Sequence, residues 1–194
     1  ANPEHRPDLE EFVVNPHYFG EVKITPKNEV VNFITVGELN PKRKNCQLLI
    51  SAVENLVSSG ITNFKITVIG RGEMTDIPEN IAQYFDIKGR LDFPTMYKEI
   101  EDADFFLPLL DPNIEAHKRY LTNGTSGSFQ LIYGFLKPAI IQKTFADTYS
   151  FSEANSIIYT NNAELAEKMN YAISLNNDTY KTLQNSLEKL RTFI

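Results

Sequence analysis

The chain has 194 residues, of which 42% are hydrophobic and 23% charged, a composition typical of a folded domain and not of a disordered chain. Its formal net charge of −6 argues against general nucleic-acid binding, which needs a basic excess to neutralise phosphates. A single cysteine excludes an internal disulfide, and the three histidines lack metal-ligand spacing, so no bound metal is expected.

Residues 1–29 are polar and rich in Pro, Glu, Asp and Lys, which predicts a linker, while residues 30–194 carry the apolar patterns of one domain. Apolar runs predict strands over residues 30–36, 64–69, 85–89, 104–110, 139–141 and 156–159. Helical spacing predicts helices over residues 47–58, 77–85, 93–100, 163–174 and 179–193, and a buried helix inside residues 122–141. Residues 111–124 are expected to form a polar loop, and residues 144–153 a loop or a short helix.

The regular alternation of strands and helices predicts an α/β fold, with a Rossmann-like parallel sheet covered by helices on both faces. Ligands of such folds bind outside the carboxyl ends of the strands. Three loops, over residues 37–45, 70–74 and 122–128, each follow a predicted strand. We therefore expect these loops to meet at one edge of the sheet and to form a binding site there.

The loop that ends in Ser126-Gly127-Ser128 suits an anion, because it precedes a predicted helix. The first N–H groups of a helix have no partner within the helix, and they carry partial positive charge. A phosphate or diphosphate is therefore the expected ligand. The alternative is that Thr125 or Ser126 only caps the helix and binds nothing.

The other two loops offer groups that suit the same ligand. Lys44, with Lys42 and Arg43 beside it, follows the first strand and could pair with a phosphate; the alternative is a solvated basic turn. Gly70-Arg71-Gly72 follows the second strand and would let a ligand approach the backbone closely. The sequence contains no G-x-G-x-x-G fingerprint, no G-x-x-x-x-G-K-[ST] loop and no G-x-S-x-G nucleophile turn.

Several short motifs occur in a fixed order between Val31 and Ala172. They are Val36-Gly37-Glu38-Leu39, Lys44-Asn45, Val68-Ile69-Gly70-Arg71-Gly72, Ile87-Lys88-Gly89-Arg90, Asp102-Ala103-Asp104-Phe105-Phe106-Leu107-Pro108, Thr125-Ser126-Gly127-Ser128 and Lys137-Pro138-Ala139-Ile140-Ile141. In this order and spacing the chain resembles the C-terminal, donor-binding domain of a GT-B glycosyltransferase of the large family often called group 1 or family 4.

The resemblance implies that the chain binds the nucleoside diphosphate of a UDP- or GDP-sugar for hexosyl transfer, with no cofactor and no metal. The diphosphate contacts implied in this way are Gly37, Lys44, Ser126, Gly127 and Ser128. The nucleotide contacts implied are Gly70, Arg71, Lys88, Gly89 and Arg90, and Gln130 could contact the ribose. No residue can be assigned a catalytic role.

The resemblance also implies a partner domain, because GT-B enzymes bind the acceptor in an N-terminal domain of comparable size. We therefore expect residues 1–29 to be the segment next to the hinge, and the chain to be part of a longer enzyme and inactive alone. A role in bacterial polysaccharide biosynthesis is implied, in the cytoplasm and at the inner face of the membrane in the full-length enzyme. No apolar run of the sequence is long enough for a transmembrane segment.

Four positions depart from the pattern of the family, and one of them is Leu136, since the usual G-x-P turn reads Leu136-Lys137-Pro138 here. Glu38 stands where an arginine is usual, and the usual pair of glutamates falls at Asn123 and Leu131. These departures leave open a second hypothesis, an α/β interaction module whose nucleotide site is lost. A third hypothesis, a receiver domain, is disfavoured because the loop after the first strand lacks an acidic cluster.

Overall fold

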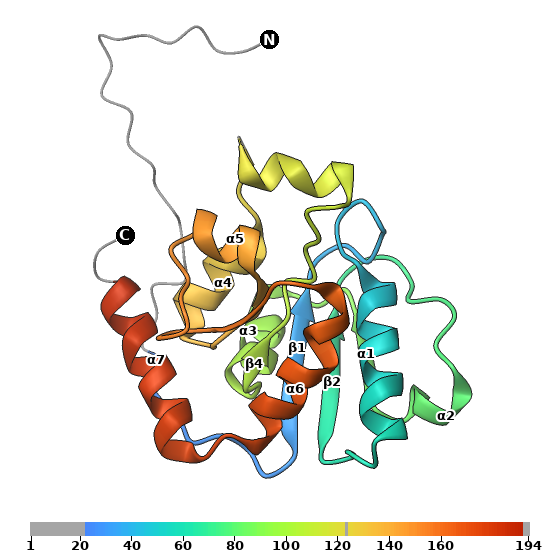
Figure 1. Ribbon diagram of the computed structural model, residues 1–194, viewed down its shortest axis with the longest axis horizontal. Helices are drawn as coiled ribbons and strands as arrows, with labels where there is room; N and C mark the ends of the chain where they lie inside the picture. Colours follow the sequence, from blue (N-terminus) through green and yellow to red (C-terminus); the bar gives the residue numbers. More distant parts are fainter. Residues whose placement is uncertain (1–21, 123, 192–194) are drawn as a thin grey trace, which may run out of the picture.

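The computed structural model describes residues 22–122 and 124–191 (Figure 1). The expectations for residues 1–21 and for Asn123 lie outside the described residues. Within the described part no helix is both long and apolar enough to span a bilayer.

Among the described residues, six parallel strands form the centre of the fold. Four of them, β1 (Val31–Val36), β2 (Phe64–Ile69), β3 (Phe85–Gly89) and β4 (Phe105–Phe106), pair in the order β3-β2-β1-β4. The other two, β5 (Ile140–Gln142) and β6 (Ile157–Tyr159), pair with each other. A single parallel bridge between Phe106 and Ala139 joins the two groups. The predicted parallel sheet is therefore confirmed.

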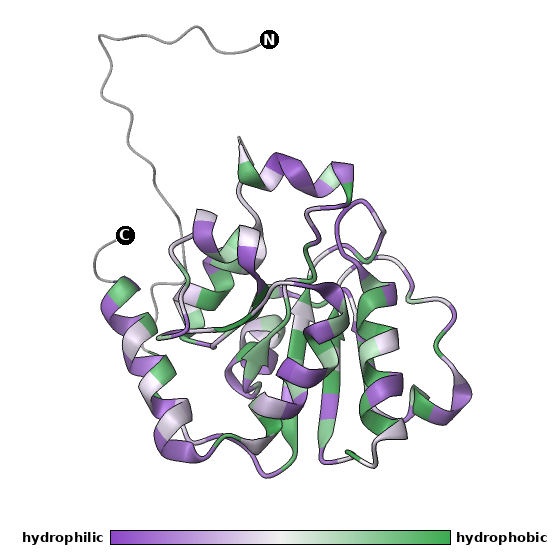
Figure 2. Cartoon of the chain, in the orientation of Figure 1, coloured by the Kyte–Doolittle hydropathy of each residue, from purple (hydrophilic) through white to green (hydrophobic). Residues whose placement is uncertain are grey.

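The sheet is buried on both faces because successive side chains of a strand point to opposite sides. In β1, Val31 and Phe33 belong to one buried apolar cluster and Ile34 to the other. Helices α1 (Cys46–Ser58), α2 (Glu79–Ala82) and α6 (Leu165–Ser174) supply residues to the first cluster. Helices α3 (Phe93–Glu101), α4 (Gly127–Phe135) and α5 (Lys143–Thr148) supply the second, and α7 (Asn177–Arg191) contributes to both. Figure 2 shows the hydrophobic residues concentrated in the central strands.

Two predicted elements are shorter than expected. The strand expected over 104–110 is reduced to Phe105–Phe106, because Pro108 has no N–H to donate and Leu109 adopts a φ of 55°. The helix expected over 77–85 covers only Glu79–Ala82.

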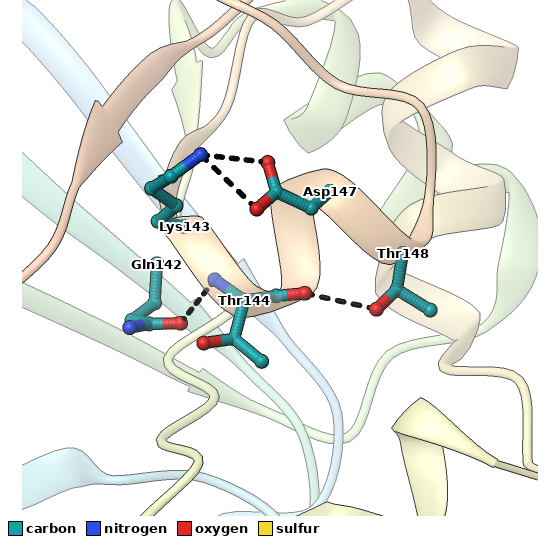
Figure 3. A network of polar contacts seen from close by, with 5 residues as sticks. All are labelled: Gln142, Lys143, Thr144, Asp147 and Thr148. Atoms are coloured by element: carbon teal, nitrogen blue, oxygen red, sulfur yellow. Dashed lines mark hydrogen bonds and ion pairs between the residues drawn. The ribbon is translucent and has the colours of Figure 1, made fainter.

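The polar loop expected over residues 111–124 contains a helix, and the segment 144–153, expected to be a loop or a short helix, begins with one. The polar loop 111–124 contains the 3₁₀ helix η1 (Glu115–Leu121), and a second such turn, η2 (Asn162–Glu164), precedes α6. Helix α5 starts directly after β5, where Gln142 Oε1 accepts a hydrogen bond from Thr144 N at 2.7 Å (Figure 3). Lys143 pairs with Asp147 one turn later, at 3.0 Å, and thereby supports this short helix.

The amino edge of the sheet is held by one buried carboxylate. Asp104 accepts hydrogen bonds from Asn28 N at 2.9 Å and from Asn32 N at 2.8 Å. Lys27 Nζ donates to Ile173 O at 2.6 Å. The described end of the expected linker, residues 22–29, is thus attached to the domain by its last residues.

Candidate functional site

The loops after β1 and β2 are joined at the carboxyl edge of the sheet. Gly37 N donates to Ile69 O at 2.8 Å, and Leu39 N donates to Arg71 O at 2.8 Å. The two backbones come so close that a Cβ atom on Gly70 would lie 1.6 Å from Gly37 O. Only glycine fits at position 70, so this contact fixes how the two loops lie.

Lys44 is buried at this edge, with a side chain that points at neutral oxygens. Its ammonium group donates to Pro108 O at 3.1 Å and to Ser128 Oγ at 3.4 Å. No ion pair joins it to a carboxylate among the residues that the structure describes. Burial lowers the pKa of Lys44 to about 8, so the group remains mostly protonated at neutral pH.

Helix α4 begins beside this ammonium group. Ser126 caps the helix, and its Oγ accepts from Ser128 N at 3.4 Å. Ser128 Oγ in turn lies 3.5 Å from Val36 O, so the start of α4 is fixed against the end of β1. The alternative interpretation of Ser126 as a cap is therefore correct for its side chain, and the N-terminus of α4 still faces the same edge as Lys44.

A cavity of about 640 Å³ opens where these groups meet. Of the sequence-derived candidates, it is lined by Gly37, Lys44, Ser126, Gly127, Ser128 and Gln130. A second cavity of about 290 Å³ adjoins it and is lined by Gly70, Arg71 and Arg90. Val36, Gly37, Glu38 and Met96 line both cavities. The three loops therefore meet at one edge, as their positions after the strands predict.

Two candidates line neither of these cavities. The Lys88 ammonium group lies 2.9 Å from Asp86 and 3.5 Å from Glu99, so it pairs with carboxylates outside the lining of both cavities. Gly89 contributes its backbone instead, because its carbonyl oxygen accepts from Gly70 N at 2.9 Å. Gly89 thus holds the loop of Gly70 in place.

Several residues of the larger cavity were not singled out from the sequence. Phe93, Met96 and Tyr97 line it from α3, and Arg119 and Tyr120 line it from η1. Arg119 and Tyr120 could have been found from their position in the sequence, because residues 111–124 follow the carboxyl end of a predicted strand. Arg43, named only as a neighbour of Lys44, also lines the cavity.

A polar cluster anchors the start of the η1 segment. Asp111 N donates to the buried His117 Nδ1 at 2.9 Å, and the Asp111 carboxylate accepts from Asn45 Nδ2 at 3.0 Å and Asn162 Nδ2 at 2.6 Å. Burial opposes the charge of Asp111, but hydrogen bonds from Asn113, Asn162 and Asn45 outweigh it and lower the pKa. Burial also lowers the pKa of His117, so this imidazole is neutral.

Comparison with solved structures identifies the architecture. A variant of TarM from S. aureus, in complex with Fondaparinux, alpha-GlcNAc-glycerol and UDP, superposes with a TM-score of 0.65 at 17% identity, covering 94% of this chain and 36% of TarM. WaaG, a glycosyltransferase involved in lipopolysaccharide biosynthesis, gives 0.63 at 14% identity, over 87% of this chain and 44% of WaaG.

The C-terminal domain of LpcC from Francisella tularensis, a group 1 family glycosyl transferase, gives a TM-score of 0.61 at 14% identity, over 84% of this chain and 85% of that domain. The chain has the fold of the C-terminal half of a GT-B glycosyltransferase. It spans little more than a third of the length of TarM. No family model and no curated protein matches the sequence.

Proposed function

We propose that this GT-B half-domain binds the nucleoside diphosphate of a sugar nucleotide and serves glycosyl transfer. One observation carries the proposal: the buried Lys44 ammonium group, Ser128 and the N-terminus of α4 meet at one cavity at the carboxyl edge of the sheet. A solved structure of the same fold, TarM, contains UDP.

In this proposal the diphosphate lies against Lys44 and the N-terminus of α4. An ammonium group has three N–H donors, and Pro108 O and Ser128 Oγ take two of them. Negative charge develops on the diphosphate as its bond to the sugar breaks. Lys44 and the N–H groups of α4 would stabilise that charge and help the nucleoside diphosphate to leave.

The smaller cavity extends the site away from the phosphates. Its walls at Gly70, Arg71, Arg90 and Leu91 suit the nucleoside, since Gly70 brings the backbone close and Leu91 offers an apolar surface. The acceptor would be bound by a separate domain, so this chain alone would bind a donor without transferring a sugar.

One observation favours a second candidate function. Glu38 lines both cavities and would repel a diphosphate, which suits an interaction module that no longer binds a nucleotide. Such a module would capture a partner protein through this edge without added nucleotide.

A titration distinguishes the donor-binding domain from the interaction module. The 194-residue chain is titrated with UDP, GDP and a UDP-sugar, and binding is followed by calorimetry and by thermal unfolding. Donor binding predicts saturable heat and a higher melting temperature with at least one of these nucleotides. No heat and no thermal shift with all three would refute the donor-binding proposal and leave the interaction module.

A further inference from the structure

Charge is distributed unevenly between the larger cavity and the rest of the chain. The chain carries a net charge of −6, yet the cavity is lined by three cations, Arg43, Lys44 and Arg119, and by one carboxylate, Glu38. The lining therefore has an excess of two positive charges. The diphosphate of a sugar nucleotide carries two negative charges, so the lining matches the ligand that the proposed function requires.

The two arginines are held by one tyrosine. Arg43 Nη1 donates to Tyr120 Oη at 3.3 Å, and the guanidinium carbon of Arg119 lies 4.7 Å from the centre of the Tyr120 ring. A cation over an aromatic face is attracted by the ring, which orients Arg119. The Tyr120 side chain thus offers its hydroxyl to one arginine and its face to the other.

Tyr120 is itself fixed in place. It is only 7% exposed, and its carbonyl oxygen accepts a hydrogen bond from Tyr149 Oη at 2.6 Å. Gly124 N donates to Arg119 O at 2.8 Å, which holds the backbone of Arg119 at the end of η1. The two guanidinium groups are therefore placed by a rigid support and not by a free loop.

The two arginines differ in their relation to Glu38. Arg43 Nε lies 3.7 Å from Glu38 Oε2, and Asn40 Nδ2 donates to Glu38 Oε1 at 2.7 Å, so part of the charge of Arg43 is offset. Arg119 makes no ion pair with any carboxylate of the described residues. Of the three cations that line the cavity, Arg119 therefore has the most N–H donors available to an anion.

We propose that Arg119, positioned by Tyr120 and assisted by Arg43, binds the diphosphate from the η1 side of the cavity. This inference rests on the proposed function. Arg119 would supply the cationic charge that Glu38 removes from the loop after β1, and its planar guanidinium group can contact two phosphate oxygens at once.

The test compares binding of UDP and of inorganic pyrophosphate to the full chain and to four variants. Arg119→Gln should raise the dissociation constant for both ligands by about tenfold or more, the effect of losing a charged hydrogen bond. Tyr120→Phe keeps the ring under Arg119 and loses the hydroxyl next to Arg43, so it should weaken binding by less than Arg119→Gln.

Lys118→Gln is the matched control. Lys118 is the neighbour of Arg119 on η1, is exposed, pairs with Glu115 at 2.6 Å and does not line the cavity. Its replacement should leave both dissociation constants unchanged. Thermal unfolding of each variant shows whether it folds, and Arg119→Lys, which retains the charge, should recover part of the affinity.

The outcomes are distinguishable. Equal affinity of Arg119→Gln and the unaltered chain for UDP and pyrophosphate would overturn the role of Arg119 and leave the proposed function standing. Absence of binding by the unaltered chain itself would refute both. A loss as large in Lys118→Gln as in Arg119→Gln would show a general charge effect and would also overturn the inference.

Discussion

Two buried lysines lie at opposite edges of the sheet and are equally hidden, each only 3% exposed. Lys44 lies at the carboxyl edge and Lys137 at the amino edge, just before β5. Burial is the main cause that lowers the pKa of each to about 8. Asp104, Asp102 and Glu101 counteract the shift at Lys137, whereas the only such influence at Lys44 is Cys46.

The comparison teaches how to tell a structural charge from a ligand-binding one. At the amino edge, Lys137 Nζ donates to Glu101 O at 2.7 Å, and the carboxylates of the surrounding acidic residues offset part of the pKa shift caused by burial. At the carboxyl edge, Lys44 has neutral oxygen partners and lines a cavity. A buried cation without a carboxylate is costly unless an anion joins it, which makes Lys44 the functional candidate of the two.

The largest expected effect is on the free energy of unfolding, when a methyl group is added to a glycine at each edge of the sheet. Gly70→Ala would place Cβ 1.6 Å from Gly37 O, and we expect the free energy of unfolding to fall by more than about 4 kcal/mol. Gly60, on the loop into β2 at the amino edge, also has a positive φ, but a Cβ there would meet nothing within 4 Å. Gly60→Ala should cost only about 1–2 kcal/mol.

Urea unfolding of both variants measures this difference. Similar decreases in the free energy of unfolding for Gly70→Ala and Gly60→Ala would show that the loops at the carboxyl edge can separate. The close contact between these loops would then not hold the site in place.

The next largest effect concerns the two lysines directly. Lys44→Met should weaken UDP binding by about 1.5–3 kcal/mol, the usual contribution of a charged hydrogen bond. Lys137→Met, at the other edge, should leave binding unchanged although the residue is equally buried. Calorimetry on both variants decides between them, and equal losses would mean that the effect of Lys44→Met is structural.

A pH series sharpens the assignment of the charge. An anion binds best to protonated Lys44, whose pKa without ligand is lowered to about 8. Below pH 8 the group is already charged, so the dissociation constant should stay constant. Above pH 8 binding must take up a proton, and the dissociation constant should rise by up to about tenfold per pH unit.

In Lys44→Met this rise above pH 8 should disappear. A rise that persists in the variant would trace the pH dependence to another group and separate Lys44 from the anion.

The smallest expected effect comes from the carboxylate at the site. Glu38→Gln removes a negative charge from both cavities and should tighten UDP binding by about 0.2–1 kcal/mol, because Glu38 and Arg43 are both partly solvated. Glu99→Gln is the control, since Glu99 pairs with Lys88 and lines neither cavity. Weaker binding of Glu38→Gln would indicate that Glu38 is needed to hold Arg43.

The fold could be predicted from the sequence where apolar periodicity was strong. The buried runs of β1 and β2 and the helical spacing of α1 gave elements within a residue or two of those observed. The expected strand at 104–110 was too long, because an apolar run does not reveal a positive φ such as that of Leu109. Helix η1 was missed because its residues are mostly polar and its buried members, His117 and Tyr120, are few.

The site was predictable to the level of loops but not of side-chain directions. Strand ends place Lys44 and Ser128 at one edge, and the structure brings them within 3.4 Å. The direction of the Lys88 side chain depends on Asp86 on β3 and Glu99 on α3, which both form ion pairs with its ammonium group. Arg119 was not foreseen, because only the fold brings it to the cavity that Arg43 and Lys44 also line.

In the described part of the chain, β4 and β5 are joined by a single bridge, between Phe106 and Ala139. This boundary has fewer backbone pairs than the boundaries between the other neighbouring strands. Lys44 belongs to the portion before this boundary, whereas Ser128 stands on α4, which leads across it. A ligand bound by both Lys44 and Ser128 would therefore connect the two parts of the sheet and stabilise the boundary between them. Amide hydrogens of β5 and β6 should then exchange more slowly on binding, while those of β1 and β2 change little.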